Sequence, residues 1–422
     1  MAEHGTPGYG TSGYGTLPAW HAARYQRALD RPARPGAFTR FAARVEAATP
    51  AHRDRAVDAL RALAILGVVL GHWLVTAFTA TGPDGMRVAS PLRTMPELTP
   101  VSWLFQTLAV FFLVGGYGAA RGLRPGDSWR RRAGRRLARL ARPVPFLLLA
   151  WVPLTAALAW AGLDGDTLRR MVKLVLSPLW FLVVYAVLVA ATPLVAAAWR
   201  RVGVWLPVAA VAATAALDLA RFGLGGPEWI GWPTVLTGWL VPFSLGVAWA
   251  DGAFRGRRAA AGLLAGGTVA AAALVLGAGY PAAMVGVPGA PVSNLNPPTL
   301  AAVAFGLAQT GAALLLRGPL TRWTRRPRAW AAVATANLAA MTIFLWHQSG
   351  MMLVTAAAFL ATGPLAGLHT SPDGLEWVPL RLVWLPAFAL VLAGLCLLPR
   401  LTRTILSQTS GRVRTSHRRA PR

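Results

Sequence analysis

Long apolar stretches recur along this 422-residue chain and constrain its fold more than any other feature. Each is about 20 residues long, the length that an α-helix needs to cross the hydrocarbon core of a bilayer. Since open sheet edges are not stable in lipid, each stretch is predicted to be a helix. Gly350 leaves room for a kink or a re-entrant piece in the ninth stretch. The predicted spans are 59–80, 101–120, 143–163, 177–198, 203–220, 229–250, 259–279, 298–316, 331–360 and 378–399.

The composition agrees with an all-α, polytopic membrane helix bundle of about ten transmembrane helices. Hydrophobic residues make up 55% of the chain and charged residues only 14%, against about 25% charged residues in soluble domains. This excludes a disordered chain, a collagen-like chain and an ordinary soluble enzyme. Cys396 is the single cysteine, and no His/Cys cluster has zinc spacing. We therefore expect no disulfide framework, no metal site and no bound cofactor.

Basic residues are distributed in register with the predicted crossings. Of the 42 Lys and Arg residues, 34 fall in alternate loops and the two tails, and 7 fall on the opposite side. Basic loops stay in the cytoplasm, so both termini are predicted to be cytoplasmic, in the inner membrane of a bacterium. The same bias explains most of the net charge of +27. No recognition motif accompanies it, and no nucleic-acid partner is expected.

Three segments follow from this pattern. Residues 1–52 are predicted to be a disordered or weakly helical, basic cytoplasmic tail that begins with a Gly/Tyr/Thr repeat. Residues 53–400 form the transmembrane domain, and residues 401–422 a basic cytoplasmic C-terminal tail. The sequence leaves the oligomeric state open.

Three ionisable residues interrupt the first apolar helix. Asp58 lies three residues before Arg61, so the two side chains can pair. His72 follows Arg61 by 11 residues, which places both on one face and about 16 Å apart along the helix axis. Ionisable groups in a membrane usually face a bundle interior or a watery cavity, and an imidazole there can serve as a general base. Alternatively, Asp58 only neutralises a snorkelling Arg61, and His72 is a hydrogen-bonded packing residue.

With these residues, the sequence resembles acyltransferase family 3, the multi-spanning membrane O-acyltransferases of cell-surface glycans and related acceptors. The resemblance covers roughly residues 53–400 and rests on five motifs in order. One position departs from the pattern, because Gly115 stands where the family has Ser. The motifs are Asp58-x-x-Arg61-x(10)-His72, Phe111-Phe-Leu-Val-Gly-Gly-Tyr117 (family Phe-Phe-x-x-Ser-Gly-Phe), the basic run 130–139, Leu179-Trp-Phe-Leu182 and Phe344-Leu-Trp-His347 (family Tyr-Leu-x-His).

The resemblance implies transfer of an acyl group, with acetyl expected, from cytoplasmic acyl-CoA to a hydroxyl at the outer side. The acceptor would be a glycan, a glycolipid or a similar molecule. Arg61 would meet the charged part of the donor, and His72 would be either the base or a covalent acyl relay. Arg132, Arg135 and Arg136 are candidates to clamp the CoA phosphates. Alternatively, these arginines only set the topology and contact anionic membrane lipids.

Three further residues are candidates for substrate binding. His347 is the second histidine placed within a predicted span. Trp180 is a candidate cavity wall, although most Trp residues near span ends belong to interfacial belts. Asn294 lies in an outer loop and could bind a sugar, but the Asn-Pro-Pro that follows it also fits a simple turn.

Two other function classes remain open at this point. A proton-coupled transporter or flippase could use the Asp58, Arg61 and His72 stripe as its pathway. A non-enzymatic relative would be compatible with the Gly115 departure. Dependence on acyl-CoA separates an acyltransferase from both.

Overall fold

The computed structural model describes residues 36–416 with gaps at 83–84, 124–125 and 127. Residues 1–35, which contain the Gly/Tyr/Thr repeat, and 417–422 lie outside the described residues. The helices are α2 (Ala37–Ala47), α3 (Arg55–Val75), α4 (Pro91–Thr94), α5 (Thr99–Ser102), α6 (Leu108–Arg121), α7 (Trp129–Ala141), α8 (Val144–Trp160), α9 (Gly165–Leu176), α10 (Leu179–Ala190), α11 (Thr192–Val202), α12 (Trp205–Asp218), α13 (Thr234–Ala250), α14 (Arg257–Gly277), α15 (Leu300–Trp323), α16 (Pro327–Thr362) and α17 (Trp377–Ser416). One antiparallel hairpin pairs β1 (Ala77–Ala80) with β2 (Met86–Ala89).

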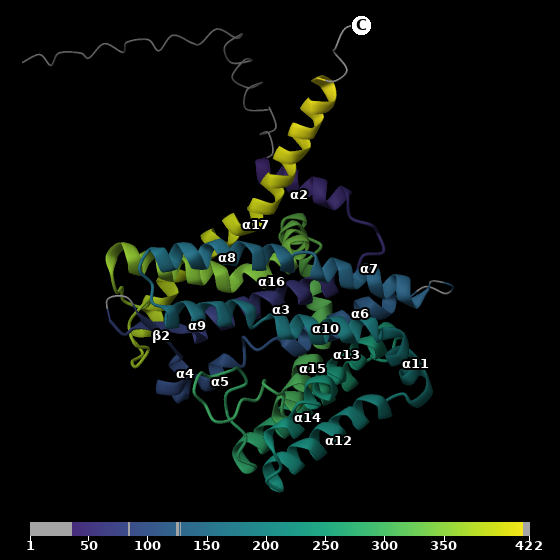
Figure 1. Cartoon of the computed structure of the whole chain (residues 1–422). Coiled ribbons are helices and arrows are strands. Elements are labelled where there is room, and N and C mark those ends of the chain that lie inside the picture. Colours follow the sequence, from purple (N-terminus) through teal and green to yellow (C-terminus); the bar gives the residue numbers. More distant parts are fainter. Residues whose placement is uncertain (1–35, 83–84, 124–125, 127, 417–422) are drawn as a thin grey trace, which may run out of the picture.

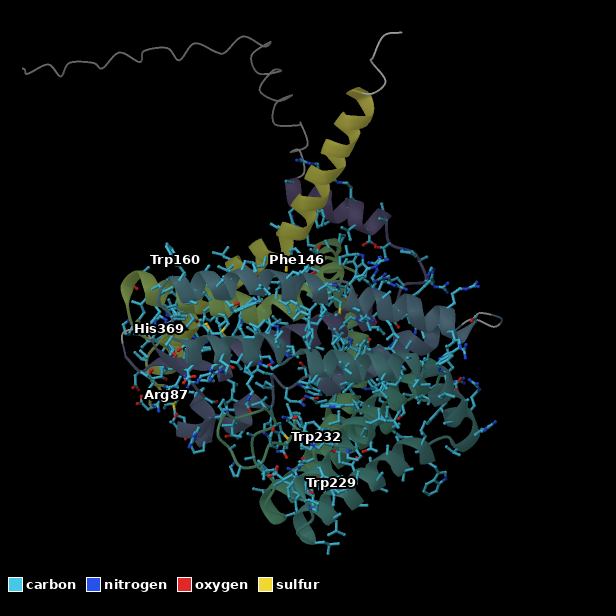
Figure 2. All side chains as sticks on the ribbon, viewed as in Figure 1. Arg87, Phe146, Trp160, Trp229, Trp232 and His369 are labelled. Carbon is cyan, nitrogen blue, oxygen red and sulfur yellow. The ribbon has the colours of Figure 1, made fainter. Side chains whose placement is uncertain are left out.

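The predicted all-α membrane bundle is confirmed. Within the described residues, nine helical segments are long and apolar enough to cross a bilayer. Two of them each combine two α-helices, since α7 and α8 form Trp129–Trp160 and α9 and α10 form Gly165–Ala190. Many large apolar side chains are exposed on the outside of the bundle, as expected for a surface that faces lipid. Trp160, Trp229 and Trp232 are among these exposed side chains (Figure 2).

The second predicted span is not a full-length helix. Helix α6 has 14 residues, about 21 Å of rise, and a turn at 103–107 precedes it. This turn packs on α3 where two glycines leave room: a Cβ on Gly71 would lie 3.1 Å from Cβ of Phe105, and one on Gly67 would lie 2.6 Å from Cγ2 of Thr107. The Thr107 hydroxyl donates to the carbonyl of Ala64 at 2.6 Å. Non-helical backbone at membrane depth is tolerated where protein covers it. Here the packing on α3 covers one side of the turn, with Gln106 buried and Leu104 exposed.

The direction of α16 shows that this short segment still crosses. Arg61 bonds Asn337 and His72 bonds Gln348, so α3 and α16 run parallel. Six of the long segments lie between α3 and α16 along the described chain. An even number of intervening crossings would make α3 and α16 antiparallel, so α6 and its turn must supply a seventh. The described residues thus make ten crossings, and the first begins on the side where the last ends. Which side is cytoplasmic stays a prediction.

The crossings form two groups joined around α3. Figure 1 shows α3, α8, α9 and α16 alongside one another, and α16 contacts the other three. Helices α12, α13, α14 and α15 form the second group, and α6, packed on both α13 and α3, links the two. The hairpin caps one end of the bundle, where Ala80 N–H donates to the carbonyl of His369 at 2.9 Å. Figure 2 shows Arg87 and His369 at this end, which we call the hairpin end; the opposite end of α3, with Asp58, is the Asp58 end.

One sequence expectation becomes more specific and another needs correction. Part of the predicted disordered tail is helix α2, whose Ala42 is buried and whose Val45 packs on Ala59 and Trp330. The order comes from an apolar stripe that finds a partner on the bundle. In addition, α16 runs through Gly350 as one 36-residue helix. That glycine instead allows close approach of α17, whose Phe388 carbonyl oxygen would lie 3.3 Å from an added Cβ.

Candidate active site

Helices α3 and α16 pair through polar side chains at two levels. At the Asp58 end, Arg61 Nη1 donates to Asp58 Oδ1 at 3.2 Å and to Asn337 Oδ1 at 3.3 Å. The Asn337 amide donates in turn to the carbonyl of Asp58 at 2.8 Å. At the second level, the Gln348 amide lies 3.0 Å from Nδ1 of His72. Asn337 and Gln348 have the same separation in sequence as Arg61 and His72, so two matching stripes face one another on parallel helices.

The predicted pairing of Asp58 with Arg61 is therefore present, and a second arginine joins it. Arg53 Nε donates to the other carboxylate oxygen of Asp58 at 2.6 Å. Asp58 is buried, and two guanidinium groups share its single negative charge. The cluster retains a net positive charge at the Asp58 end of the stripe.

His347, a sequence candidate for substrate binding, lies beside His72. Their ring centroids are 5.0 Å apart. Nδ1 of His347 lies 2.6 Å from the carbonyl of Phe344, so Nδ1 carries the proton and donates it. Nε2 of His347 is buried and has no hydrogen-bond partner. Because a buried nitrogen without a partner is unusual, Nε2 of His347 is a candidate to contact a polar group in the site.

Two tryptophans fix this part of α16 from neighbouring helices. Trp73 of α3 donates through Nε1 to the carbonyl of His347 at 2.9 Å. Trp151 of α8 donates through Nε1 to the hydroxyl of Ser349 at 2.9 Å. The histidine pair is thus held between three helices rather than on a loop, which favours a rigid site.

A third histidine, the buried His369, contrasts with this pair. Its Nε2 donates to the carbonyl of Thr355 at 2.9 Å, and its Nδ1 accepts from Leu365 N–H at 3.0 Å. Burial lowers the pKa of His369, so the ring is neutral at physiological pH. With both nitrogens paired inside the protein, His369 stabilises the hairpin end and is not a site candidate.

A cavity of about 410 Å³ opens beside Arg61. Arg136 and Arg139 of α7 line it together with Arg61, and none of its lining residues is acidic. Arg136 Nη1 donates to the carbonyl of Ala119 at 3.2 Å, which holds the side chain across the end of α6. Met341 of α16 also lines the cavity, one turn beyond Asn337 towards Gln348. The cavity suits an anion, because three guanidinium groups converge on it.

Gly115 and Tyr185 meet in the wall of this cavity. A Cβ added to Gly115 would overlap the Tyr185 ring and would lie 2.9 Å from its hydroxyl oxygen. Tyr185 therefore fills the space that a serine side chain would need at position 115. The ring is part of an aromatic cluster that continues through Phe111 and Phe181 to Phe344, whose centroid lies 6.1 Å from that of His347.

The other two sequence candidates, Trp180 and Asn294, lie outside this site. Trp180 is 37% exposed, whereas its neighbour Phe181 is 3% exposed and packs on Phe344. Asn294 is fully buried in the connection between α14 and α15, where its amide bonds the carbonyls of Pro281 and Ala283 and the Thr299 hydroxyl. Because these bonds satisfy the amide internally, it has no group left for a sugar. Neither residue contacts the histidine pair.

The three predicted arginines of the basic run also differ in their relation to the cavity. Arg136 lines the cavity, whereas Arg135 is an exposed residue outside its lining. Arg132 belongs to α7, but its side chain lies outside the described residues. Arg139, which sequence reasoning did not select, lines the cavity because it follows Arg136 by three residues on the same helix face. No cluster of three or more metal-binding side chains occurs in the described part of the chain.

Comparison with known proteins agrees with this arrangement. The acyltransferase family 3 domain model, described as an acyltransferase domain, matches residues 54–401. The chain belongs to this acyltransferase family. No curated protein and no solved structure matches the chain. Family membership and the ten-crossing bundle together make the protein a multi-pass membrane acyltransferase. In the family motif of the second span, Gly115 faces Tyr185 rather than empty space.

The Gly115 and Tyr185 contact makes a testable prediction about packing. Gly115→Ser should destabilise the protein by about 1–3 kcal/mol, because the added side chain overlaps an aromatic ring in a packed core. Unfolding of the purified protein in detergent would measure the loss. Tyr185→Leu in the same chain should recover part of it, because the two sites are in contact. Gly266→Ser is the matched control, since a Cβ there meets nothing within 4 Å. A Gly115→Ser protein as stable as wild type would contradict the prediction.

Proposed function

We propose that this protein is an O-acyltransferase of the bacterial inner membrane. It moves an acyl group, with acetyl expected, from cytoplasmic acyl-CoA to a hydroxyl of a glycan, glycolipid or similar acceptor at the outer side. The observation that carries the proposal is the alignment of a cationic cavity, Arg61 and His72 along one pair of parallel helices. A charged donor that enters from one side and a polar acceptor that enters from the other would meet along this pair of helices.

The donor end of the site is the cavity at Arg61. Its guanidinium groups, from Arg61, Arg136 and Arg139, are suited to bidentate bonds with phosphate oxygens. Asp58 and Asn337 hold Arg61 in place, so its remaining donors are available to the ligand. Acyl-CoA is thus a co-substrate that binds through its phosphates, with the acyl arm directed along α16 towards the histidines.

The chemistry is assigned to His72. Its imidazole takes the proton of the acceptor hydroxyl while that oxygen attacks the thioester carbonyl. The carbon–sulfur bond then breaks, the new ester forms, and the CoA thiolate leaves and takes up a proton. Covalent relay is the alternative, in which His72 itself carries the acyl group before the acceptor binds. Release of one equivalent of CoA from donor and enzyme without acceptor would identify the relay.

The function is tested by comparing envelope glycans and small glycolipids between a deletion strain and the complemented strain by mass spectrometry. A species that gains one acyl mass only with the wild-type gene would identify the acyl group and the acceptor together. Family membership favours this outcome over a proton-coupled carrier. A carrier would leave the profile unchanged and would not release free CoA in a purified system.

Arg61→Ala tests the donor end separately. We expect the KM for acyl-CoA to rise by about 10- to 100-fold, because a charge-assisted hydrogen bond contributes about 1.5–3 kcal/mol. The KM for the acceptor should change much less. Thiol release at varied donor and acceptor concentrations measures both, with exposed Arg169→Ala as the control. If only the acceptor KM moved, Arg61 would belong to the acceptor end.

A further inference from the structure

The polar environment of His72 contains one side chain whose role the family resemblance does not assign. Gln348 is completely buried, and its amide lies 3.0 Å from Nδ1 of His72. No other side-chain hydrogen bond to the His72 ring occurs among the described residues. The second amide atom, Oε1 of Gln348, is buried without a partner. The amide therefore sits in the membrane interior with the imidazole as its side-chain partner.

The contact with Gln348 leaves Nε2 as the one nitrogen of His72 that can meet a substrate. Nδ1 is already occupied, and His72 remains partly exposed while His347 is fully buried. A neutral imidazole has one protonated and one unprotonated nitrogen. For Nε2 to accept a proton, Nδ1 must carry the hydrogen and donate it to an acceptor.

We propose that Gln348 is a positioning residue that fixes the tautomer of His72, by accepting the Nδ1 hydrogen through its side-chain oxygen. The proposal rests on the proposed role of His72 as the base. As placed, the amide nitrogen faces Nδ1, but a flip of the amide exchanges nitrogen and oxygen at nearly the same positions. In the flipped form the oxygen gains a donor, and Nε2 of His72 keeps its lone pair for the acceptor hydroxyl.

The matching stripe on α16 supports this assignment. Asn337 orients Arg61 at one level, as Gln348 orients His72 at the other. The Trp73 bond to His347 and the Trp151 bond to Ser349 hold the backbone and side chains on either side of Gln348. A group anchored from two helices can fix a ring more firmly than one on a mobile loop.

No acidic group lies near His72 in the described chain. Adding one carboxylate at position 348 is therefore an informative substitution. The ionisable groups of the packed elements near it are His347, at 5.0 Å between rings, and Arg381 of α17, which bonds the carbonyl of Trp73. The nearest acid on α3 is Asp58, four helical turns or about 21 Å away. Gln348→Glu would therefore place the first carboxylate beside this imidazole, and a carboxylate can only accept from Nδ1.

The test compares Gln348→Glu and Gln348→Met with wild type in a purified acyl-CoA thiol-release assay across pH. We expect Gln348→Met to lower kcat by about 10- to 100-fold with little change in either KM, because the Nδ1 hydrogen loses its acceptor and the reactive tautomer of His72 becomes less populated. Gln348→Glu should retain activity, with the rise of kcat with pH moved by about 1–3 units towards higher pH, because a carboxylate favours the imidazolium. Gln309→Met, at another glutamine in a membrane helix, is the control.

Several outcomes would overturn the proposal. A Gln348→Met protein with wild-type kcat and pH profile would show that the amide only packs. A folded Gln348→Glu protein as inactive as His72→Ala would show that the amide donates to His72 instead. Both results would leave the role of His72 intact. An active His72→Ala protein would remove the role of His72 and that of Gln348 with it.

Discussion

His72→Ala should eliminate acyl transfer while leaving the bundle intact. A positioned general base contributes about 10²–10⁴-fold to a rate, and no other imidazole in the site can replace it. His347 is fully buried, whereas His72 is partly exposed and can meet an incoming hydroxyl. Mass spectra of glycans and glycolipids from a complemented deletion strain should therefore lack the acylated species that wild type restores.

The matched control for this variant is His52→Ala. His52 is exposed near the start of α3 and is absent from the polar stripe. Both variants should reach the membrane in amounts equal to wild type and elute as the same species in detergent. Acyl transfer by His72→Ala at wild-type level would refute the assignment of the chemistry to this helix.

Arg381→Met should have the largest effect on stability. Arg381 is buried at the start of α17, where Nε donates to the carbonyl of Trp73 at 2.8 Å and Nη2 to that of Thr76 at 2.7 Å. These carbonyls close the C-terminal end of α3, where a positive charge also complements the helix dipole. Leaving two buried carbonyls unpaired should cost about 2–6 kcal/mol.

Unfolding of Arg381→Met in detergent measures this loss directly. Arg169→Met, in a side chain that is 81% exposed, should be close to neutral. Activity measured below the unfolding transition should fall as well, because α3 carries His72 just before this bond. A variant that unfolds at the wild-type temperature would mean that α17 is held on α3 by apolar packing alone.

Helix periodicity made the polar stripe of α3 predictable, and hydropathy made the spans predictable. The spacing of Asp58, Arg61 and His72 in the sequence places them on one face whatever surrounds the helix. The same spacing relates Asn337 to Gln348, but the sequence could not show that the two stripes meet. That depends on α16 lying parallel to α3.

Local sequence could not decide between adjacent residues of similar chemistry. Trp180 and Phe181 are both large and aromatic, and only the neighbouring helices determine that Phe181 faces the interior. Asn294 reads as a free polar group until the carbonyls of its own loop are seen to satisfy it. The role of Arg381 has no local signal, because its acceptors are the carbonyls of a helix far earlier in the chain.

The two levels of pairing between α3 and α16 fix the distance between Arg61 and His72. The levels have the same separation in sequence on both helices, so the interval between Arg61 and His72 is held at about 16 Å along the axis. On the proposed function, the protein selects its donor by the distance between phosphates and thioester as well as by charge. A thioester on a short arm cannot occupy the arginines and the imidazole at once, whereas an arm that spans the interval is held at both ends. A fixed interval does not distinguish acyl groups beyond the thioester. Phe344, which lies between the two levels on α16 and packs on Phe181 and His347, is the aromatic residue placed to contact that group.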